Sequence, residues 1–240
     1  MTQLLYQTDS YLKEFQASVI EINSAENSIA LDRTAFYPGG GGQPNDLGTI
    51  KSSERDFPVT KVKSLEGVVW HWIEGPLPAV RTEVVGQLDW DRRYKLMRTH
   101  TALHILCGVI WRDYGAHVTG ANIEPLKARM DFELETLPKD LVKDIETKVN
   151  LEVQNARPIQ IKILPREEAF KIPDLIRTKI NLLPEHIKEV RTVEIVGLDL
   201  QADGGTHVAN TKEVGLVRII DYQSKGKINK RIYIELNPGN

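Results

Sequence analysis

The sequence contains one cysteine, Cys107, and has neither a long apolar run nor an excess of one charge. A single cysteine rules out an internal disulfide and any zinc site that needs two cysteines. No segment approaches the ~18 to 20 apolar residues of a membrane span. Residues 1–15 lack the basic and apolar stretches of a secretory signal. We therefore expect a cytoplasmic protein with no membrane partner.

The charges nearly balance over the chain but not within its parts. The 31 Lys and Arg residues and the 33 Asp and Glu residues give a net charge of −2. Residues 1–89 carry 7 basic and 12 acidic residues, a net of −5, whereas residues 90–240 carry a net of +3. These values exclude a protein that wraps nucleic acid, although small basic clusters suffice to grip the end of an RNA. The clusters that we expect to contact RNA, unless they are only solvated faces, are Arg92 with Arg93 and Lys225 with Lys227.

Residues 1–89 are predicted to form short β-strands. The segments are rich in Val, Ile and aromatic residues, and turn residues separate them. A spacing of roughly ten residues favours a small barrel or sandwich over βαβ units. We expect a first domain at 1–89 with strands at 15–22, 28–37, 59–65, 68–73 and 83–90.

From residue 90 onward the apolar residues follow a helical period. From Leu96 to Trp111 the residues of one helical face follow a three-four spacing, and Leu106, Val109 and Ile110 make the rest of the segment apolar too. This pattern predicts a helix that is buried nearly all round. A second helix is expected between Pro138 and Arg157. Helices and strands in separate runs indicate an α+β domain at 90–240, so the fold class is α+β with a small N-terminal β-barrel. The other expected elements are strands at 158–164, 190–196, 213–222 and 230–236 and short helices at 166–170 and 173–179.

Two histidines lie four residues apart in the first of these helices, in the segment RTHTALH (98–104). That spacing places the imidazoles of His100 and His104 ~6 Å apart on one face, as two ligands of one metal ion require. A pair of hydrogen-bonded core histidines is the alternative. A zinc protease is disfavoured because Thr101 stands where the protease motif has a glutamate.

Further ligands are expected from the segment DLQADGGTHV (199–208), which places Asp203 and His207 on either side of a double glycine. Glycines allow the tight bend that brings two such side chains to one point. Nitrogen and oxygen ligands suit zinc, although a carboxylate selects zinc less strongly than a thiolate does. The alternative is that Asp203 only caps its own turn. Cys107 is another candidate ligand on the face of His100, although a lone cysteine more commonly serves in packing.

These segments resemble the editing domain of alanyl-tRNA synthetase, and most of all the freestanding AlaX-type alanyl-tRNA editing proteins. The segment RTAFYPGGGGQPNDLG (33–48) is similar to the glycine-rich motif of their N-terminal barrel. The resemblance implies a trans-editing hydrolase, which cleaves the aminoacyl ester of mischarged tRNA(Ala). Its substrates would be chiefly Ser-tRNA(Ala) and in some members Gly-tRNA(Ala). Because no aminoacylation core precedes the barrel, a freestanding member is expected.

The resemblance also implies one zinc ion per chain. The family's ligands are two helix histidines and a Cys-x-x-x-His pair, which correspond to His100, His104, Asp203 and His207. The sequence departs from the family at Asp203, which stands where a cysteine is usual. Aspartate is a competent zinc ligand, so we expect weaker zinc binding rather than lost activity.

Two further regions are implied to contact the amino acid. A polar residue downstream of the second helix histidine corresponds to Thr119, whose hydroxyl would pair with a seryl side chain and find no partner on alanine. An ordinary Thr-Gly turn is the alternative. The family's glycine-rich loop faces the editing pocket, and by itself such a loop is flexible or brings backbone amides to a phosphate or carbonyl. The loop residues expected to contact substrate are Gly40, Gly41, Gly42 and Gln43.

Two other functions stay open from the residues alone. The chain could be a non-catalytic, metal-stabilised tRNA-binding module, or a metal hydrolase that acts on an unrelated small ester. The sequence assigns no general base, and it does not distinguish a monomer from a homodimer.

Overall fold

The computed structural model describes residues 2–178 and 187–238. The chain divides into two compact units, Met1–Lys95 and Leu96–Asn240. Helix α1 (Trp90–Tyr114) crosses this division. The sequence placed the boundary at Asp89, one residue before α1 begins, whereas the two units divide within the helix.

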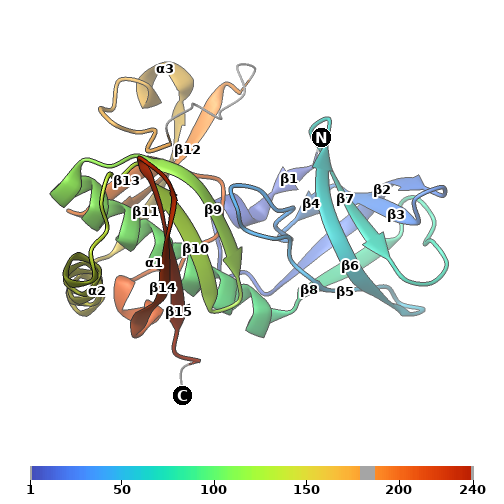
Figure 1. Ribbon diagram of the computed structural model, residues 1–240. Coiled ribbons are helices and arrows are strands. Elements are labelled where there is room, and N and C mark those ends of the chain that lie inside the picture. The colour runs from blue at the N-terminus through green and yellow to red at the C-terminus, as the bar shows by residue number, and fades with distance from the viewer. Residues whose placement is uncertain (1, 179–186, 239–240) are drawn as a thin grey trace. The chain divides into compact units, whose positions relative to one another are not determined.

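The first unit contains a closed β-barrel with the strand order β2-β3-β7-β6-β5-β8, which confirms the predicted barrel (Figure 1). Neighbouring strands of the barrel are antiparallel. A parallel pair of short strands, β1 (Gln3–Leu4) and β4 (Arg33–Thr34), and the 3₁₀ helix η1 (Leu5–Gln7) also belong to this unit. The barrel strands are β2 (Glu14–Asn23), β3 (Ser28–Leu31), β5 (Gly48–Lys51), β6 (Asp56–Leu65), β7 (Val68–Ile73) and β8 (Glu83–Leu88).

Alternate residues of the barrel strands form its core, because successive side chains of a strand point to opposite faces. In β2 the inward residues are Phe15, Ala17 and Val19, and all three are buried. Gly86 of β8 makes room for one of them, since a Cβ at this position would lie 2.4 Å from the ring of Phe15. His71 of β7 is also inside, with Nε2 2.9 Å from Thr34 Oγ1 and Nδ1 3.3 Å from Ile29 O.

The second unit is the predicted α+β region. It contains a four-stranded sheet in the order β14-β15-β10-β9 and a three-stranded sheet in the order β11-β12-β13. The strands of the first sheet are β9 (Val118–Glu124), β10 (Lys127–Phe132), β14 (Val217–Gly226) and β15 (Asn229–Leu236). Those of the second sheet are β11 (Ile159–Pro165), β12 (Glu189–Ile195) and β13 (Asp199–Ala202). The further helices are α2 (Lys139–Gln154), α3 (Arg166–Ala169) and the 3₁₀ helix η2 (Thr211–Val214).

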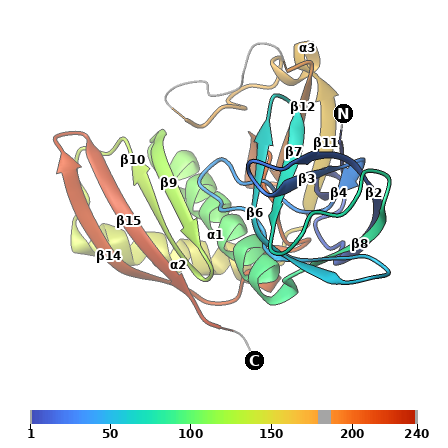
Figure 2. The ribbon, with the colours of Figure 1, turned by 90° about the vertical axis from the view of Figure 1, so that its right-hand side faces the viewer.

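Helix α1 is the centre of this unit. Every residue from Leu96 to Ile110 is buried, which confirms the prediction of a helix buried nearly all round. Figure 2 shows α1 and α2 against the four-stranded sheet, and α2 buries Ile145, Val149 and Val153. Among residues 2–178 and 187–238, no helix combines the length and the apolar composition that crossing a membrane requires.

The structure corrects the sequence at one predicted helix. Residues 173–178 form a turn followed by an extended segment in place of the short helix expected at 173–179, and Lys179 lies outside the described residues. Thr178 pairs with Val118 in an isolated bridge, so backbone pairing to a strand replaces a marginal helical turn. Strands β1, β5, β9, β10 and β13 were not predicted.

Candidate metal centre

His100 and His104 lie on the buried middle of α1, one turn apart. Their side chains are 5% and 7% exposed, and their ring centroids are 5.1 Å apart. The helix therefore presents two imidazoles side by side in a region that excludes water. This is the arrangement that the four-residue spacing predicted.

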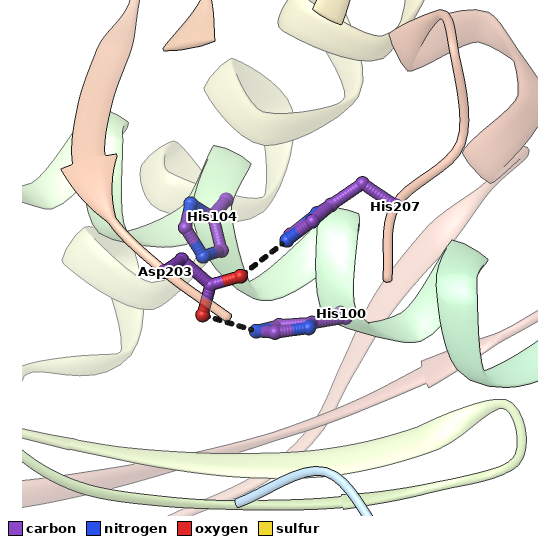
Figure 3. A group of neighbouring side chains, drawn as sticks. All are labelled: His100, His104, Asp203 and His207. Carbon is purple, nitrogen blue, oxygen red and sulfur yellow. Dashed lines mark hydrogen bonds and ion pairs between the residues drawn. The ribbon is translucent and has the colours of Figure 1, made fainter. Parts of the chain in front are cut away.

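Asp203 and His207 reach the same point from the loop that follows β13 (Figure 3). His207 is buried, and its ring centroid lies 4.3 Å from that of His100 and 4.7 Å from that of His104. One potential ligand atom from each of the four side chains lies within 4.8 Å of the others. Two segments about a hundred residues apart in the sequence thus bring three imidazoles and one carboxylate together, and such a group could bind a metal ion.

Asp203 caps its own turn and also faces the histidines, so its geometry is compatible with both roles that the sequence offered as alternatives. Its Oδ2 accepts hydrogen bonds from the backbone N–H of Gly205 at 2.8 Å and from His207 Nε2 at 2.9 Å, so the carboxylate does cap its own turn. Its Oδ1 faces His100 Nε2 at 3.6 Å. The cap holds one carboxylate oxygen, and the other points into the histidine group.

The electrostatics of the group favour neutral imidazoles at His100 and His207 beside a charged carboxylate. Burial would lower the pKa of His104, but the carboxylates of Asp199 and Asp203 outweigh it and raise this pKa. Burial holds the pKa of His100 well below its ordinary value and lowers that of His207 to about 4. Burial would raise the pKa of Asp203, but the contacts with His100 and His207 outweigh it and hold this pKa well below its usual range. A neutral imidazole and an ionised carboxylate are the protonation states that bind a metal, so these donors fit a cation.

Three neighbouring residues were missed by the sequence analysis. Arg191 of β12 is buried, and its Nη1 donates to Asp203 O at 2.8 Å. Thr101 Oγ1 lies 3.2 Å from His207 Nδ1, and Asp199 Oδ2 lies 3.3 Å from His104 Nδ1. Thr101 lies in the segment RTHTALH and Asp199 in the segment DLQADGGTHV. Their closeness in sequence to the candidate ligands was the only signal that could have identified them.

Cys107 lies beside this group in the sequence but belongs to its packing. Its thiol is buried and accepts a hydrogen bond from Gln201 Nε2 at 3.3 Å. Burial raises the pKa of the thiol well above its ordinary value, so the group stays protonated. A protonated thiol is a poor metal ligand.

The residues expected to contact substrate lie in different units. Thr119 is exposed on β9 of the second unit, where its hydroxyl donates to Asn229 Oδ1 at 3.1 Å. It is part of a strand, so the alternative of a simple Thr-Gly turn does not describe it. Gly40 and Gln43 of the first unit form an isolated backbone bridge, and the loop between them needs positive φ values at Gly41 and Gly42, which favour glycine.

The four basic residues expected to contact RNA are not equally accessible. Arg93 is fully buried in the first unit, where it forms an ion pair with Asp46 and donates from Nη1 to Ser10 O at 2.9 Å. This structural role corrects the expectation that Arg93 contacts RNA, because a buried and paired guanidinium cannot reach a phosphate. Arg92 is half-buried, whereas Lys225 and Lys227 are exposed at the β14–β15 turn.

Comparisons with known proteins identify the family. The chain is 43% identical over 242 residues to the alanyl-tRNA editing protein AlaX-M of Saccharolobus solfataricus, and the match covers 99% of this chain and 100% of that protein. It is 39% identical over 242 residues to AlaX-M of Methanosarcina barkeri, covering 98% and 99%. The chain belongs to the AlaX-M family of alanyl-tRNA editing proteins.

The chain is also similar in sequence to tRNA synthetases. It is 39% identical over 225 residues to the alanine–tRNA ligase of Pyrobaculum aerophilum, covering 91% of this chain and 25% of the ligase. Residues 6–92 match the family model for class II (A) tRNA synthetases. Residues 190–233, which include Asp203 and His207, match the second additional domain of threonyl and alanyl tRNA synthetases. These matches confirm the resemblance drawn from the three sequence motifs.

Proposed function

We propose that this alanyl-tRNA editing protein hydrolyses the ester that joins a wrong amino acid to tRNA(Ala). Ser-tRNA(Ala) is the main substrate and Gly-tRNA(Ala) a second one. The observation that carries the proposal is the group of three buried histidines, His100, His104 and His207, with the partly buried Asp203, in a chain that matches AlaX-M over its whole length.

The metal of this group is proposed to be one zinc ion per chain. His100, His104, Asp203 and His207 would hold it, and their nitrogen and oxygen donors fit zinc. A bound zinc ion would supply positive charge that polarises an ester carbonyl or lowers the pKa of a water. Because Asp203 replaces a thiolate, the site is also suited to harder divalent ions, and zinc selectivity is weaker than in a site with cysteine.

The other residues of the chain supply recognition. Thr119 is proposed to give the seryl hydroxyl a hydrogen-bond partner, exchanging its bond with Asn229 for one with the substrate. The loop of Gly40, Gly41, Gly42 and Gln43 is proposed to contact the substrate, as the family resemblance implies. An alanyl ester would leave the hydroxyl of Thr119 without a new partner, so binding favours the wrong amino acid over the right one.

The tRNA is proposed to contact the exposed Lys225 and Lys227 and the half-buried Arg92. Phosphate contacts fix the position of an RNA and carry little sequence information. These residues would therefore hold the acceptor end, while the histidine group and Thr119 deal with the amino acid.

The function is tested by deacylation of Ser-tRNA(Ala) and Ala-tRNA(Ala) by the same zinc-loaded sample. We expect Ser-tRNA(Ala) to be hydrolysed at least ~10²-fold more efficiently, because a site that bonds a substrate hydroxyl discriminates strongly against the analogue without it. The double variant His100→Ala and His207→Ala should lose this activity. Equal rates for the two esters would contradict editing. Turnover of neither ester with intact tRNA(Ala) binding would indicate a binding module.

A further inference from the structure

Asp199, the first residue of β13, places a carboxylate against one of the four side chains of the candidate metal centre. Its side chain is 0% exposed, and Oδ2 lies 3.3 Å from Nδ1 of His104. This nitrogen of His104 is buried and makes no hydrogen bond to the described residues, so the carboxylate of Asp199 is the polar group placed to receive its proton. Burying a carboxylate is costly unless it is paired, so its position next to a histidine needs a physical reason.

The surroundings of Asp199 hold its carboxylate in place from two sides. Gln201 Nε2 donates to Oδ2 at 2.6 Å, and Arg177 Nε lies 3.4 Å from Oδ1. The guanidinium of Arg177 is itself held against the ring of Trp111, 4.6 Å from the ring centroid. The carboxylate thus has a balancing cation and a fixed orientation before any metal binds.

A glycine in the middle of α1 permits this contact. Gly108 lies one turn after His104, and a Cβ on it would come within 3.0 Å of Asp199 Cβ and 2.9 Å of Leu198 Cγ. Glycine inside a helix is destabilising relative to alanine, so its presence here needs a reason. At this position it allows β13 to approach α1 closely enough for Asp199 to reach the imidazole.

A carboxylate beside Nδ1 determines which nitrogen of a neutral imidazole carries the proton. An ionised carboxylate only accepts hydrogen bonds, so it stabilises the tautomer with the proton on Nδ1. In that tautomer the lone pair is on Nε2. We propose that Asp199 is a positioning residue, which holds His104 with Nδ1–H toward its own carboxylate and the Nε2 lone pair toward Asp203 and the other histidines.

This inference rests on the metal site of the proposed function and adds to it. Partners that orient a metal-bound histidine also raise its basicity, and their loss typically costs 10- to 100-fold in metal affinity. A purely structural role for Asp199 would instead affect folding and leave metal binding unchanged. The two roles therefore differ in a measurable quantity.

The first test measures zinc affinity by competition with a chelator for the wild type and Asp199→Asn. The amide keeps the shape of the side chain but is not a carboxylate, and we expect zinc affinity to fall ~10- to 100-fold. Glu152→Gln is the matched control, because Glu152 is another buried carboxylate of the same unit and binds Arg112 at 2.7 Å and Arg157 at 2.6 Å. The control should lower the thermal midpoint without changing zinc affinity. Unchanged affinity in a folded Asp199→Asn protein would overturn the proposal.

The second test needs no variant and no metal. Nitrogen-15 NMR of the metal-free wild type, at a pH where the His104 ring is neutral, reports which ring nitrogen carries the proton. We expect Nδ1–H, and a predominant Nε2–H tautomer would refute the role of Asp199 even if Asp199→Asn fails to fold. A wild type that binds no divalent metal but shows the Nδ1–H tautomer would refute the metal in the proposed function and leave the positioning of His104 supported.

Discussion

The side chain of Asp203 determines the chemical character of the candidate metal centre. It occupies the position where the family resemblance expects a cysteine. Its Oδ2 is engaged by the N–H of Gly205 and by His207, and its Oδ1 faces His100. A single carboxylate can therefore stabilise the turn with one oxygen and contribute the other to a metal.

Substitution of Asp203 separates these two contributions. If Asp203 is a ligand, the order of zinc retention against a chelator should be Asp203→Cys above the wild type and the wild type above Asp203→Ala. Thiolate is better matched to zinc than carboxylate, and alanine provides no donor. The measurement is bound zinc during a chelator titration of all three proteins.

The same two variants also control for loss of the turn cap that Asp203 provides. Neither cysteine nor alanine replaces the hydrogen bond that Oδ2 accepts from Gly205, so both variants lose the cap to a similar degree. Their loss of thermal stability without metal should be similar, at about 1 kcal/mol. Identical zinc retention in the two variants would remove Asp203 from the ligand set.

At the scale of elements, the sequence predicted those helices and strands whose apolar residues follow a regular period. The all-round apolar pattern of residues 96–110 identified α1, and its four-residue histidine spacing identified the pair on that helix. Strands β9 and β10 were missed because their residues alternate imperfectly, with Met130, Asp131 and Phe132 buried in succession. Burial of consecutive residues depends on what covers both faces of a strand, and that is a tertiary property.

The site residues show the same limit. The spacing predicted His100 and His104, whereas Asp199 was recognised only through its contact with His104. Arg93 was assigned to RNA because a charge cluster in a sequence does not reveal a partner 47 positions away, namely Asp46. Long-range pairing of charges is decided by packing, and local charge patterns carry no information on it.

The buried His71 of the barrel should make the stability of the protein depend on pH. Burial between β3, β4 and β7 lowers the pKa of His71 to about 4 from 6.5, although its contact with Ile29 O partly opposes this. The unfolded chain therefore takes up the proton at higher pH than the folded one. The contribution of neutral His71 is fully present above pH 6.5 and is lost as the pH falls toward 4, by about 3 kcal/mol in total.

His71→Gln tests this titration, because glutamine can donate and accept hydrogen bonds without taking up a proton. Urea unfolding should show that the free energy of unfolding falls between pH 7 and pH 4 by about 3 kcal/mol more in the wild type than in the variant. Carboxylates titrate in both proteins, so the difference isolates His71. Parallel pH profiles would show that His71 does not titrate in this way.

At the scale of the whole molecule, the uneven distribution of charge along the chain bears on which surface contacts RNA. The first 89 residues carry a net charge of −5 and the remainder +3. With Arg93 committed to Asp46, the accessible lysines of the β14–β15 turn are the better candidates for phosphate contact. A contact of this kind is electrostatic, so it weakens as salt concentration rises.

Removal of both charges by Lys225→Ala and Lys227→Ala should weaken tRNA(Ala) binding and raise the Michaelis constant for Ser-tRNA(Ala) with little change in kcat. Each lost phosphate contact removes ~0.7 to 0.9 from the slope of log K against log salt, so the pair should reduce the slope by about 1.5. The matched control is Lys139→Ala with Lys143→Ala, which removes the same charge from exposed positions of α2. If the RNA contacts the β14–β15 turn, only the Lys225 and Lys227 double variant should reduce the slope of log K against log salt. Equal flattening in both double variants would instead assign the effect to net charge, and an unchanged slope in the Lys225 and Lys227 variant would place the RNA on another surface.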